Sequence, residues 1–440
     1  MIDTAPDARG VHGPDAMLDA LRRAAGADAV EVPVSGWTVH GNAPRAIVSP
    51  TTVDAVAAVL ELCSAEGWIV EPAGSGTWLD HGRAPERPAD IILSTRRLDQ
   101  RLESEPADLV VGTDAGVKFD VLQARLATHG QELTLDPPHH PDATIAATIA
   151  LAAAGPLRAS AGTPRDHVLG IEAVSGDGRL LRFGGRVVKN VAGYDAVRLL
   201  TGSRGTLGVI TSVWLRVRAR PVAERSFALS GELPAVLQVL AGLQDMAIAA
   251  TELLSPSTAA ALGLPRAWTL TLRLRGGPAE LTAAAIRIAG SVAGAEFRDL
   301  ATPAWDGLAR LELPARPLIR VTGLGSDLQA LLDQSVSFIS ASGNDLDDWH
   351  LAAHARSGIV RLWPKRQPEA EHLERLVGPL AALREETHAA GGTVVLECAP
   401  PALQEHVPAR ATGDEITRRL ETSLKQVFDP AGILAPGRWP

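Results

Sequence analysis

Cysteine is scarce in this chain. The two cysteines, Cys63 and Cys398, lie in apolar settings, and neither has a second thiol near it in sequence. Isolated cysteines of this kind are typical of buried thiols in a reducing compartment, and they argue against both a disulfide framework and a cysteine metal site. We therefore expect two free, buried cysteines.

The chain also lacks a basic block and a long apolar run. Its formal net charge of -9 argues against general affinity for nucleic acid or for an anionic membrane. The most apolar segment, residues 143–157, is short and is broken by Gly155-Pro156, so we expect a core element and no membrane span. The first residues, MIDTAPDARGVHGPDA, do not resemble a signal peptide. We expect a cytoplasmic protein that reaches the inner membrane face only through partners.

A dense group of glycines stands out between residues 184 and 211. The same stretch contains the single tyrosine, Tyr194, and one of very few lysines, Lys189. Such a density of glycine is useful where the backbone turns tightly or lies against a bulky ligand. The sequence therefore predicts one wall of a nucleotide cofactor site here.

A second glycine-rich loop follows an alternation of strand and helix. We expect a strand at 46–49, a helix at 53–63 capped by Thr51 or Thr52, and a strand at 68–72 that enters Ala73-Gly-Ser-Gly-Thr77. A Gly-x-Gly loop can direct backbone N–H groups at a pyrophosphate. The loop lacks the third glycine and the helix of a Rossmann fingerprint, and no P-loop motif occurs. Taken alone, an ordinary tight turn is an equal alternative.

The rest of the first half continues as mixed strands and helices. An amphipathic helix at 14–25 precedes this half, the loops are 136–141 and 160–167, and we expect strands at 90–94, 109–112, 168–174, 180–183 and 209–217 and helices at 118–129 and 143–154. His139-His140 suggests a metal, but adjacent residues in a proline-rich loop rarely point at one ion. We predict no metal site.

From about residue 225 the pattern becomes that of an antiparallel sheet with helices on one face. Strands are expected at 225–230, 248–255, 267–275, 295–300, 317–322, 358–363 and 392–398, and helices at 234–244, 278–290, 325–338 and 367–389. Residues 416–428 form a last helix. With 440 residues, two or three domains are expected. We divide the chain into an N-terminal helical extension (1–42), a first domain (43–222), an α+β domain (223–400) and a C-terminal helix with a return segment (401–440).

Five segments in order resemble the FAD-binding fold of the vanillyl-alcohol oxidase and p-cresol methylhydroxylase (PCMH) superfamily. They are Pro72-Ala-Gly-Ser-Gly-Thr, Asp136-Pro-Pro with Ala143-Thr-Ile, Arg165-Asp-His-Val-Leu-Gly170, Gly202-Ser-Arg-Gly-Thr-Leu-Gly-Val-Ile-Thr211 and Asp429-Pro-Ala-Gly-Ile-Leu-Ala-Pro-Gly-Arg438. The resemblance implies an α+β protein with a two-subdomain PCMH-type FAD-binding domain, an α/β cap domain with an antiparallel sheet, and a C-terminal segment that returns to the FAD domain.

Lys189-Asn-Val-Ala-Gly-Tyr-Asp195 is most similar to the E subunits of bacterial glycolate oxidases. These flavoproteins work beside a sister flavoprotein and an iron–sulfur subunit. The sister subunits have arginine and threonine where this chain has Val188 and Ala192, and a histidine metal-ligand run that residues 397–404 lack. The resemblance implies an FAD-dependent oxidoreductase acting on a 2-hydroxy acid such as glycolate. A noncatalytic or electron-transfer subunit remains the alternative, and the missing carboxylate and metal ligands favour it.

The resemblance also implies roles for individual residues. The backbone of 73–77 would hold the pyrophosphate, Thr144 and Ile145 the flavin side, and the 202–211 loop the adenosine half, unless that loop is a plain turn. The full set of implied FAD contacts is Pro72, Ala73, Gly74, Ser75, Gly76, Thr77, Pro137, Thr144, Ile145, Arg165, Gly202, Ser203, Gly205, Thr206, Gly208, Val209, Ile210 and Arg438.

Some details depart from the pattern or stay open. Ala146 and Ala147 replace the family's two glycines. The glycine-rich loop has no histidine, so we expect noncovalent FAD, with His81 just beyond the loop as the remaining candidate for a covalent link.

Lys189 and Tyr194 are the candidates for the reacting side of the flavin. An ammonium there would favour a reduced, anionic ring, and a phenol could orient a hydroxyl or carboxylate. Alternatively, Lys189 pairs with Asp195 or with a carbonyl, and Tyr194 packs within the fold. Arg438 contacts FAD or is a surface arginine. We expect Arg165 and Asp166 to form an ion pair.

Overall fold

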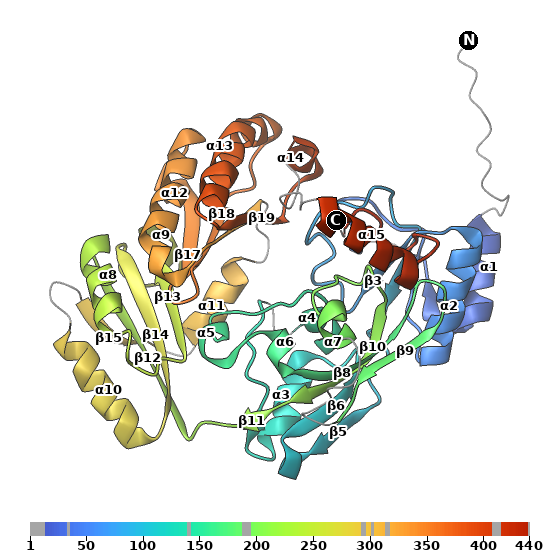
Figure 1. Cartoon of the computed structure of the whole chain (residues 1–440), viewed down its shortest axis with the longest axis horizontal. Helices are drawn as coiled ribbons and strands as arrows, with labels where there is room; N and C mark the ends of the chain where they lie inside the picture. Colours follow the sequence, from blue (N-terminus) through green and yellow to red (C-terminus); the bar gives the residue numbers. More distant parts are fainter. Residues whose placement is uncertain are drawn as a thin grey trace.

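The computed structural model describes residues 14–32, 36–138, 142–186, 195–291, 296–300, 303–312, 317–406 and 415–438. Figure 1 shows two regions side by side. Residues 14–219 form most of an N-terminal region, and residues 223–406 form what we call the cap region. The last described residues, 415–438, return to the N-terminal region.

A four-stranded sheet begins the N-terminal region. Its strand order is β1-β2-β4-β3, with β2, β4 and β3 parallel. Between β2 and β3 lies α2, where Thr52 accepts a hydrogen bond from the Ala55 amide at 3.2 Å and Gly67 ends the helix with φ of 69°. The elements are α1 (Pro14–Ala25), the 3₁₀ helix η1 (Ala27–Ala29), β1 (Val30–Glu31), β2 (Ala46–Val48), α2 (Val53–Glu66), β3 (Val70–Ala73) and β4 (Ile91–Ser94).

A five-stranded antiparallel sheet completes this region, in the order β5-β6-β10-β8-β9. A short pair, β7 with β11, lies beside it. The strands are β5 (Leu102–Glu105), which the sequence pattern did not predict, β6 (Val110–Asp114), β7 (Gln131–Glu132), β8 (Val168–Val174), β9 (Leu180–Gly184), β10 (Val209–Arg216) and β11 (Arg218–Ala219). The helices are η2 (Pro106–Asp108), α3 (Phe119–Ala127), α4 (Ile145–Ala150), α5 (Arg158–Ala161), α6 (Pro164–His167) and α7 (Ala196–Leu200).

Two predictions for this region need correction. The helix expected over 143–154 covers only α4, because Ala152 adopts a left-handed conformation with φ of 50°. The loop expected over 160–167 contains the short helices α5 and α6. The second of these begins with a capping box in which Thr163 and Asp166 hold each other.

The cap region is built on an eight-stranded sheet in the order β15-β12-β14-β13-β17-β18-β16-β19, and every adjacent pair is antiparallel. Its strands are β12 (Ala223–Gly231), β13 (Ala250–Leu254), β14 (Trp268–Gly276), β15 (Glu296–Leu300), β16 (Leu318–Thr322), β17 (Trp349–His354), β18 (Ile359–Pro364) and β19 (Thr393–Cys398). Its helices are α8 (Leu233–Gly242), α9 (Pro256–Ala261), α10 (Pro278–Gly290), α11 (Pro303–Leu311), η3 (Gly325–Asp327), α12 (Leu328–Ala341), η4 (Leu346–Asp348), α13 (Ala370–Ala389) and α14 (Pro401–His406). The strand β17 was not predicted.

The two faces of the cap sheet differ in polarity. On the outer face, apolar residues such as Leu272, Val321 and Leu362 are fully buried with residues of α8, α10, α12 and α13. Figure 1 shows these four helices on the side away from the N-terminal region. The inner face carries charged residues, among them Glu252 and Arg361, which the two-residue side-chain period places opposite the apolar set. The predicted α+β class is confirmed, except that the short helices α9 and α11 pack on the inner face.

The two ends of the chain both join the core of the N-terminal region. Helix α1 buries Met17 and Leu21 there. Helix α15 (Glu415–Phe428) and the segment after it bury Phe428 and Leu434 in the same core, and Leu434 pairs with Val70 of β3. The predicted C-terminal return is therefore confirmed.

Cys63 and Cys398 are both buried, and they are not joined in a disulfide, as expected. In the described part of the chain, no helix is both long enough and apolar enough to span a bilayer.

Candidate cofactor and substrate site

A cavity of about 670 Å³ lies between the glycine-rich loop 73–77 and the loop 204–210. We call it the glycine-walled cavity. Helix α4 closes one side of it and Arg438 another. Its lining residues are Glu71 to Leu79, Thr95, Ala146, Ala147, Ala150, Leu151, Arg204, Gly205, Gly208, Val209, Ile210 and Arg438.

The loop 73–77 directs the carbonyl groups of Ala73 and Gly74 to the sheet and leaves the N–H groups of 74–77 without an acceptor among the described residues. The Ala73 carbonyl accepts a hydrogen bond from the Thr95 amide at 2.8 Å, and the Gly74 carbonyl accepts one from the Ser94 hydroxyl at 2.7 Å. None of the N–H groups of residues 74–77 donates to another residue in the described ranges. Because buried or cavity-lining N–H groups need acceptors, this loop fits an anionic ligand such as a pyrophosphate.

Two glycines let the walls approach each other. A Cβ on Gly74 would overlap the hydroxyl of Thr144 and lie 3.0 Å from its methyl group. Gly205 has φ of 77°, and a Cβ there would lie 2.9 Å from Cβ of Pro72. Glycine is thus required at both positions by contact between walls, and at Gly205 also by backbone conformation.

Arg438 closes the cavity from the C-terminal segment. Its guanidinium donates to Glu71 at 2.9 Å and to the Leu79 carbonyl, and both charged side chains are almost fully buried. Burial raises the pKa of Glu71 to about 7, against the opposing effect of Arg438. The alternative that Arg438 is a surface arginine is wrong.

The structure brings most of the predicted FAD contacts together in this cavity. Those on its wall are Pro72, Ala73, Gly74, Ser75, Gly76, Thr77, Gly205, Gly208, Val209, Ile210 and Arg438. Ala146 and Ala147, which replace the expected glycines, also line it. Their methyl groups are therefore part of the surface that a ligand meets.

The remaining predicted contacts lie off the wall. Thr144 and Ile145 sit behind it, where Thr144 accepts a hydrogen bond from the Ala147 amide at 3.3 Å and begins α4. Gly202, Ser203 and Thr206 shape the turn before β10, in which the Thr206 hydroxyl donates to the Ser203 carbonyl at 2.6 Å. Pro137 lines a different cavity.

Arg165 is exposed and lines none of the cavities described here. The expected ion pair between Arg165 and Asp166 is wrong. Asp166 instead accepts hydrogen bonds from the backbone and hydroxyl of Thr163, which lowers the pKa of its carboxyl group. The N–H groups at the start of a helix need such an acceptor, and Asp166 provides one at the start of α6.

Lys189 and Tyr194 lie outside the described residues, and so do His139 and His140. The predicted roles of Lys189 and Tyr194 stay predictions. The expectation that His139 and His140 bind no metal also stays a prediction. Asp195, considered as a partner for Lys189, caps α7 and pairs with Arg198 at 3.0 Å.

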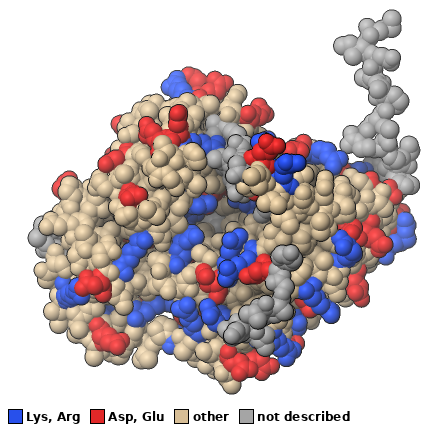
Figure 2. Space-filling model, viewed as in Figure 1, with Lys and Arg blue, Asp and Glu red and all other residues tan. Residues whose placement is uncertain are grey.

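A second cavity of about 840 Å³ shares Trp78, Leu151 and Arg204 with the glycine-walled cavity. We call it the arginine chamber, because Arg158 of α5 and Arg320 and Arg361 of the cap sheet line it together. Figure 2 shows Lys and Arg side chains around the hollow at the centre of the molecule. The other lining residues are His81, Pro138, Ala152, Ala153, Ala154, His354 and Glu397.

Arg320 and Arg361 are direct cross-strand neighbours on β16 and β18. Like charges opposite each other destabilise a sheet unless they are compensated. Glu397 compensates them, since it accepts from Arg320 at 2.8 Å and from Arg361 at 3.3 Å. Burial raises the pKa of Glu397, but Arg361 and Arg320 together hold it at about 2. Arg361 also pairs at 2.5 Å with Glu312, whose pKa burial raises to about 7.

Arg158 completes the chamber from the N-terminal region. Its guanidinium makes no hydrogen bond or ion pair with another described residue, although the side chain is partly buried. Burial, followed by the nearby charge of Arg320, lowers the pKa of Arg158. An unpaired guanidinium beside two more arginines is an anion-binding arrangement.

The sequence analysis missed this chamber. Its arginines come from helix α5 and from strands β16 and β18. Helix α5 was not predicted. A usable signal exists in Leu318-Ile-Arg-Val-Thr and Ile359-Val-Arg-Leu-Trp-Pro, where one arginine interrupts an otherwise apolar strand. Such a residue faces a buried partner or a cavity more often than it does water, because Arg is seldom buried unless it is paired.

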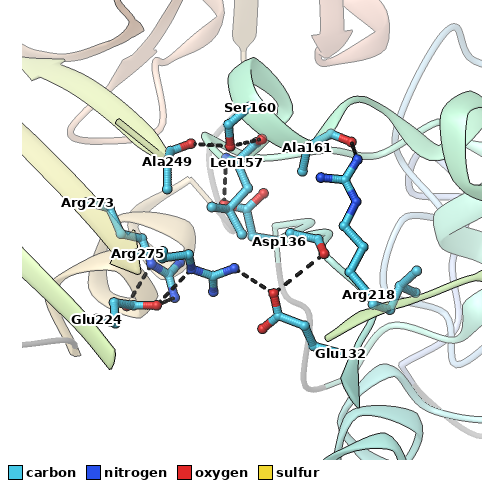
Figure 3. A network of polar contacts seen from close by, with 12 residues as sticks. Glu132, Asp136, Leu157, Ser160, Ala161, Arg218, Glu224, Ala249, Arg273 and Arg275 are labelled. Atoms are coloured by element: carbon cyan, nitrogen blue, oxygen red, sulfur yellow. Dashed lines mark hydrogen bonds and ion pairs between the residues drawn. The ribbon is translucent and has the colours of Figure 1, made fainter. Parts of the chain in front are cut away.

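A third cavity of about 1080 Å³ lies where the cap sheet meets β7 and the loop after it. We call it the seam cavity. Figure 3 shows the polar network on its wall. Arg275 donates to Glu132 at 2.8 Å and to Glu224 at 2.9 Å, and Glu224 also accepts from Arg273 at 2.7 Å. Asp136 accepts from the Leu157 amide at 3.0 Å, and burial raises its pKa to about 6.

Comparison with known proteins agrees with this geometry. Residues 44–184 match the model of a family described as FAD binding domain. The chain is 30% identical over 335 residues to glycolate oxidase subunit GlcE of Escherichia coli K12, covering 76% of this chain and 83% of the relative. It is 26% identical over 426 residues to glycolate oxidase subunit GlcD of Bacillus subtilis 168, covering 90% and 88%. A D-lactate dehydrogenase of Archaeoglobus fulgidus is 37% identical over 183 residues, which is 40% of each chain.

Solved structures share the fold. p-Cresol methylhydroxylase with bound substrate aligns with a TM-score of 0.76 at 16% identity over 96% of both chains. The 4-ethylphenol oxidase of Gulosibacter chungangensis aligns with a TM-score of 0.75 at 18% identity over 99% of both chains. The match to the FAD binding domain family and the sequence relatives show a PCMH-type flavoprotein and FAD-dependent oxidoreductase, in agreement with the fold and the cavity. Within that class, the chain belongs to the family of the glycolate oxidase subunits.

Proposed function

We propose that this chain oxidises a small 2-hydroxy acid, with glycolate as the leading candidate, on FAD held in the glycine-walled cavity. The observation that carries the proposal is the arginine chamber, which shares wall residues with that cavity. A carboxylate held by the arginines would lie beside the cofactor. The names of the relatives, glycolate oxidase subunits and a D-lactate dehydrogenase, support the same substrate class.

The charges of the chamber suit a monocarboxylate. Among Arg158, Arg320 and Arg361, two positive charges are compensated by Glu397 and Glu312 when both acids are ionised, so one positive charge is left over in this group. Arg158 supplies it, because its guanidinium has no partner among the described residues. Arg204 also lines the chamber. A guanidinium binds a carboxylate with two parallel hydrogen bonds, which also fixes its orientation. The hydroxyl-bearing carbon is then positioned relative to the cofactor cavity.

The residues of the glycine-walled cavity fit FAD. The N–H groups of 74–77 would bind the pyrophosphate, and Gly205 and Gly208 the adenosine half. FAD supplies the hydride acceptor for the oxidation of an alcohol to a carbonyl. Lys189 and Tyr194 remain our candidates for groups near the reacting ring, and the loop without histidine suggests that FAD is not covalently attached.

The alternative is a subunit that only binds FAD and transfers electrons, while a sister subunit oxidises the substrate. The absence of the expected arginine and threonine at Val188 and Ala192 favoured it. The arginine chamber supports the catalytic role instead, because it offers a carboxylate site built from other elements. In either case we propose that the chain works with a sister flavoprotein and an iron–sulfur subunit, through which it could lie at the inner membrane face. We also propose that the domains of the chain divide after residues 42, 222 and 400.

Anaerobic reduction of the flavin tests the proposal. Glycolate or D-lactate added to the isolated FAD-loaded chain should bleach the flavin absorbance without partner subunits. Arg158→Met should weaken substrate binding at least tenfold, since a charged hydrogen bond contributes about 1.5–3 kcal/mol. Arg375→Met is the matched control, because Arg375 pairs with Glu371 on the exposed face of α13.

Bleaching that requires a sister subunit would favour the electron-transfer role. Precipitation of the protein with acid distinguishes the cofactor linkage, because noncovalent FAD should remain in the supernatant. A chain that cannot be loaded with FAD would contradict the whole assignment.

A further inference from the structure

His354 and Glu252 form a buried pair that the proposed binding roles leave unused. They are direct cross-strand partners on β17 and β13, and Nδ1 of His354 contacts Oε1 of Glu252. Glu252 is fully buried, and His354 is 4% exposed. Burying a carboxylate costs free energy unless the carboxylate accepts a hydrogen bond from a nearby donor. The pair is therefore a built feature of the inner face of the cap sheet.

The exposed edge of this pair faces the chamber. His354 lines the arginine chamber together with Arg158, Arg320 and Arg361, and it also lines the seam cavity. Its Nε2 atom makes no hydrogen bond to another described residue. The second ring nitrogen is thus available to a ligand held by the arginines.

The contact with Glu252 sets the chemistry of that nitrogen. A carboxylate that accepts from Nδ1–H keeps the proton on Nδ1, so Nε2 carries a lone pair and can accept a proton. The same carboxylate stabilises the imidazolium that forms when Nε2 takes a proton. A neutral imidazole oriented in this way is a suitable general base.

We propose that His354, oriented by Glu252, is the base that removes the hydroxyl proton of the substrate. The inference rests on the proposed function. The O–H bond of the 2-hydroxy acid breaks and its proton goes to Nε2. The hydrogen on the same carbon would leave with its electron pair, for which FAD would supply the acceptor, and the carbon–oxygen bond becomes a carbonyl. The product is a 2-oxo acid, and His354 is left as an imidazolium.

Other charged groups surround the pair. Arg361 on β18 and Arg273 on β14 are cations near it, and Arg158 and Arg320 line the same chamber. Glu312 just after α11, Asp136 in the loop after β7 and Glu397 on β19 are nearby acids. The pKa of Asp136 and that of Glu312 are raised by burial to about 6 and about 7. A pH profile must therefore separate three groups.

The decisive variant is His354→Asn. Its side-chain amide can still donate to Glu252, but it is no base. We expect flavin reduction by glycolate to slow at least 100-fold, within the range of about 10² to 10⁴ for general base catalysis, while the dissociation constant of glycolate changes less than threefold. The control is His350→Asn, which lies on the same face of the same strand, two side-chain periods away. His350 is buried against Trp363 and lines none of the described cavities. Reduction by His354→Asn within threefold of wild type would overturn the proposal.

A second variant covers the case in which His354→Asn fails to fold. Glu252→Gln should slow reduction and shift the midpoint of the rate against pH to a lower value, because the imidazolium loses its carboxylate. Asp136→Asn should move that midpoint by no more than about 0.3 pH units, which is about a twofold change in proton affinity. A midpoint that moves with Asp136→Asn and not with Glu252→Gln would assign the base to another group.

Failure of the proposed function gives a different result. If no 2-hydroxy acid bleaches the wild-type flavin, ¹⁵N NMR of His354 in the FAD-loaded protein decides the inference by itself. The proposal requires the Nδ1–H tautomer and a shift of Nε2 when glycolate binds. An Nε2–H tautomer, or no response of Nε2 to glycolate, would refute it.

Discussion

Gly74 shows how a single residue can decide whether the glycine-walled cavity forms. A methyl group at this position would overlap the Thr144 hydroxyl, which caps α4. We expect Gly74→Ala to lower FAD affinity at least tenfold, because relief of the overlap must move either the loop or the cap. Loss of the cap alone costs about 1 kcal/mol. FAD affinity is measured by fluorescence titration of the flavin-free protein.

The double variant Gly74→Ala, Thr144→Ala tests this cause directly. It removes the overlapping side chain and should recover part of the lost affinity. Gly242→Ala serves as control, since a Cβ on Gly242 meets no atom within 4 Å. A double variant no better than Gly74→Ala would mean that the overlap with Thr144 is not the cause.

Helix α15 and the segment after it act as one element on the glycine-walled cavity. Lys425 donates to the carbonyls of Thr206 and Leu434, both at 2.7 Å, and pairs with the buried Asp429 at 2.7 Å. Asp429 in turn accepts from the amides of Ile433 and Leu434. The C-terminal segment thus fixes the turn before β10, which forms one wall of the cavity.

Lys425→Met should therefore affect both stability and cofactor binding. Removing one partner of a buried ion pair costs about 3–5 kcal/mol, and we expect thermal unfolding to occur several degrees lower and FAD affinity to fall. Lys365→Met is the control, because Lys365 is exposed and its side chain makes no hydrogen bond or ion pair with another described residue. Unchanged unfolding of Lys425→Met, followed by circular dichroism, would contradict this role of the C-terminal segment.

At the scale of the whole molecule, the parts predicted from sequence are those encoded locally. The loop 73–77 is recognisable because glycines and small polar residues follow a strand. The C-terminal return could be inferred because Asp429-Pro-Ala-Gly and Pro436-Gly-Arg438 mark turns around a short apolar run. The antiparallel cap sheet was visible from the alternation of its strands. Each of these signals lies within about ten residues of sequence.

The substrate side could not be predicted in the same way. Arg158, Arg320 and Arg361 are far apart in sequence and meet only through the pairing of β16 with β18 and the docking of α5. The strand that carries His354 was missed because Trp349-His-Leu-Ala-Ala-His mixes buried histidines with alanines of low strand propensity. The partner of Asp166 was predicted wrongly. Asp166 accepts hydrogen bonds from Thr163 at the start of α6 and does not pair with the adjacent Arg165.

Contacts between the N-terminal and cap regions hold the chamber together. On one side Arg275 joins Glu132, and the Ser160 hydroxyl donates to the Ala249 carbonyl at 2.7 Å. On the other, the Gly82 amide donates to the Glu397 carbonyl at 2.7 Å. The glycine-walled cavity needs only the N-terminal region and the C-terminal segment, whereas the arginine chamber needs both regions.

This division predicts that Arg275→Met separates the two binding functions. Losing the bond to Glu132 should loosen the docking of the cap and raise the dissociation constant of glycolate about 3- to 10-fold, where tenfold corresponds to about 1.4 kcal/mol. The affinity for FAD should stay unchanged. Arg287→Met is the control, because its pair with Asp245 lies on the cap surface. Both dissociation constants can be measured by titration of the same preparation. FAD binding is followed by fluorescence. Glycolate binding is followed by calorimetry on the anaerobically reduced, FAD-loaded protein, in which no turnover occurs. A parallel loss of both affinities would show that the two cavities depend on the same contacts between the regions.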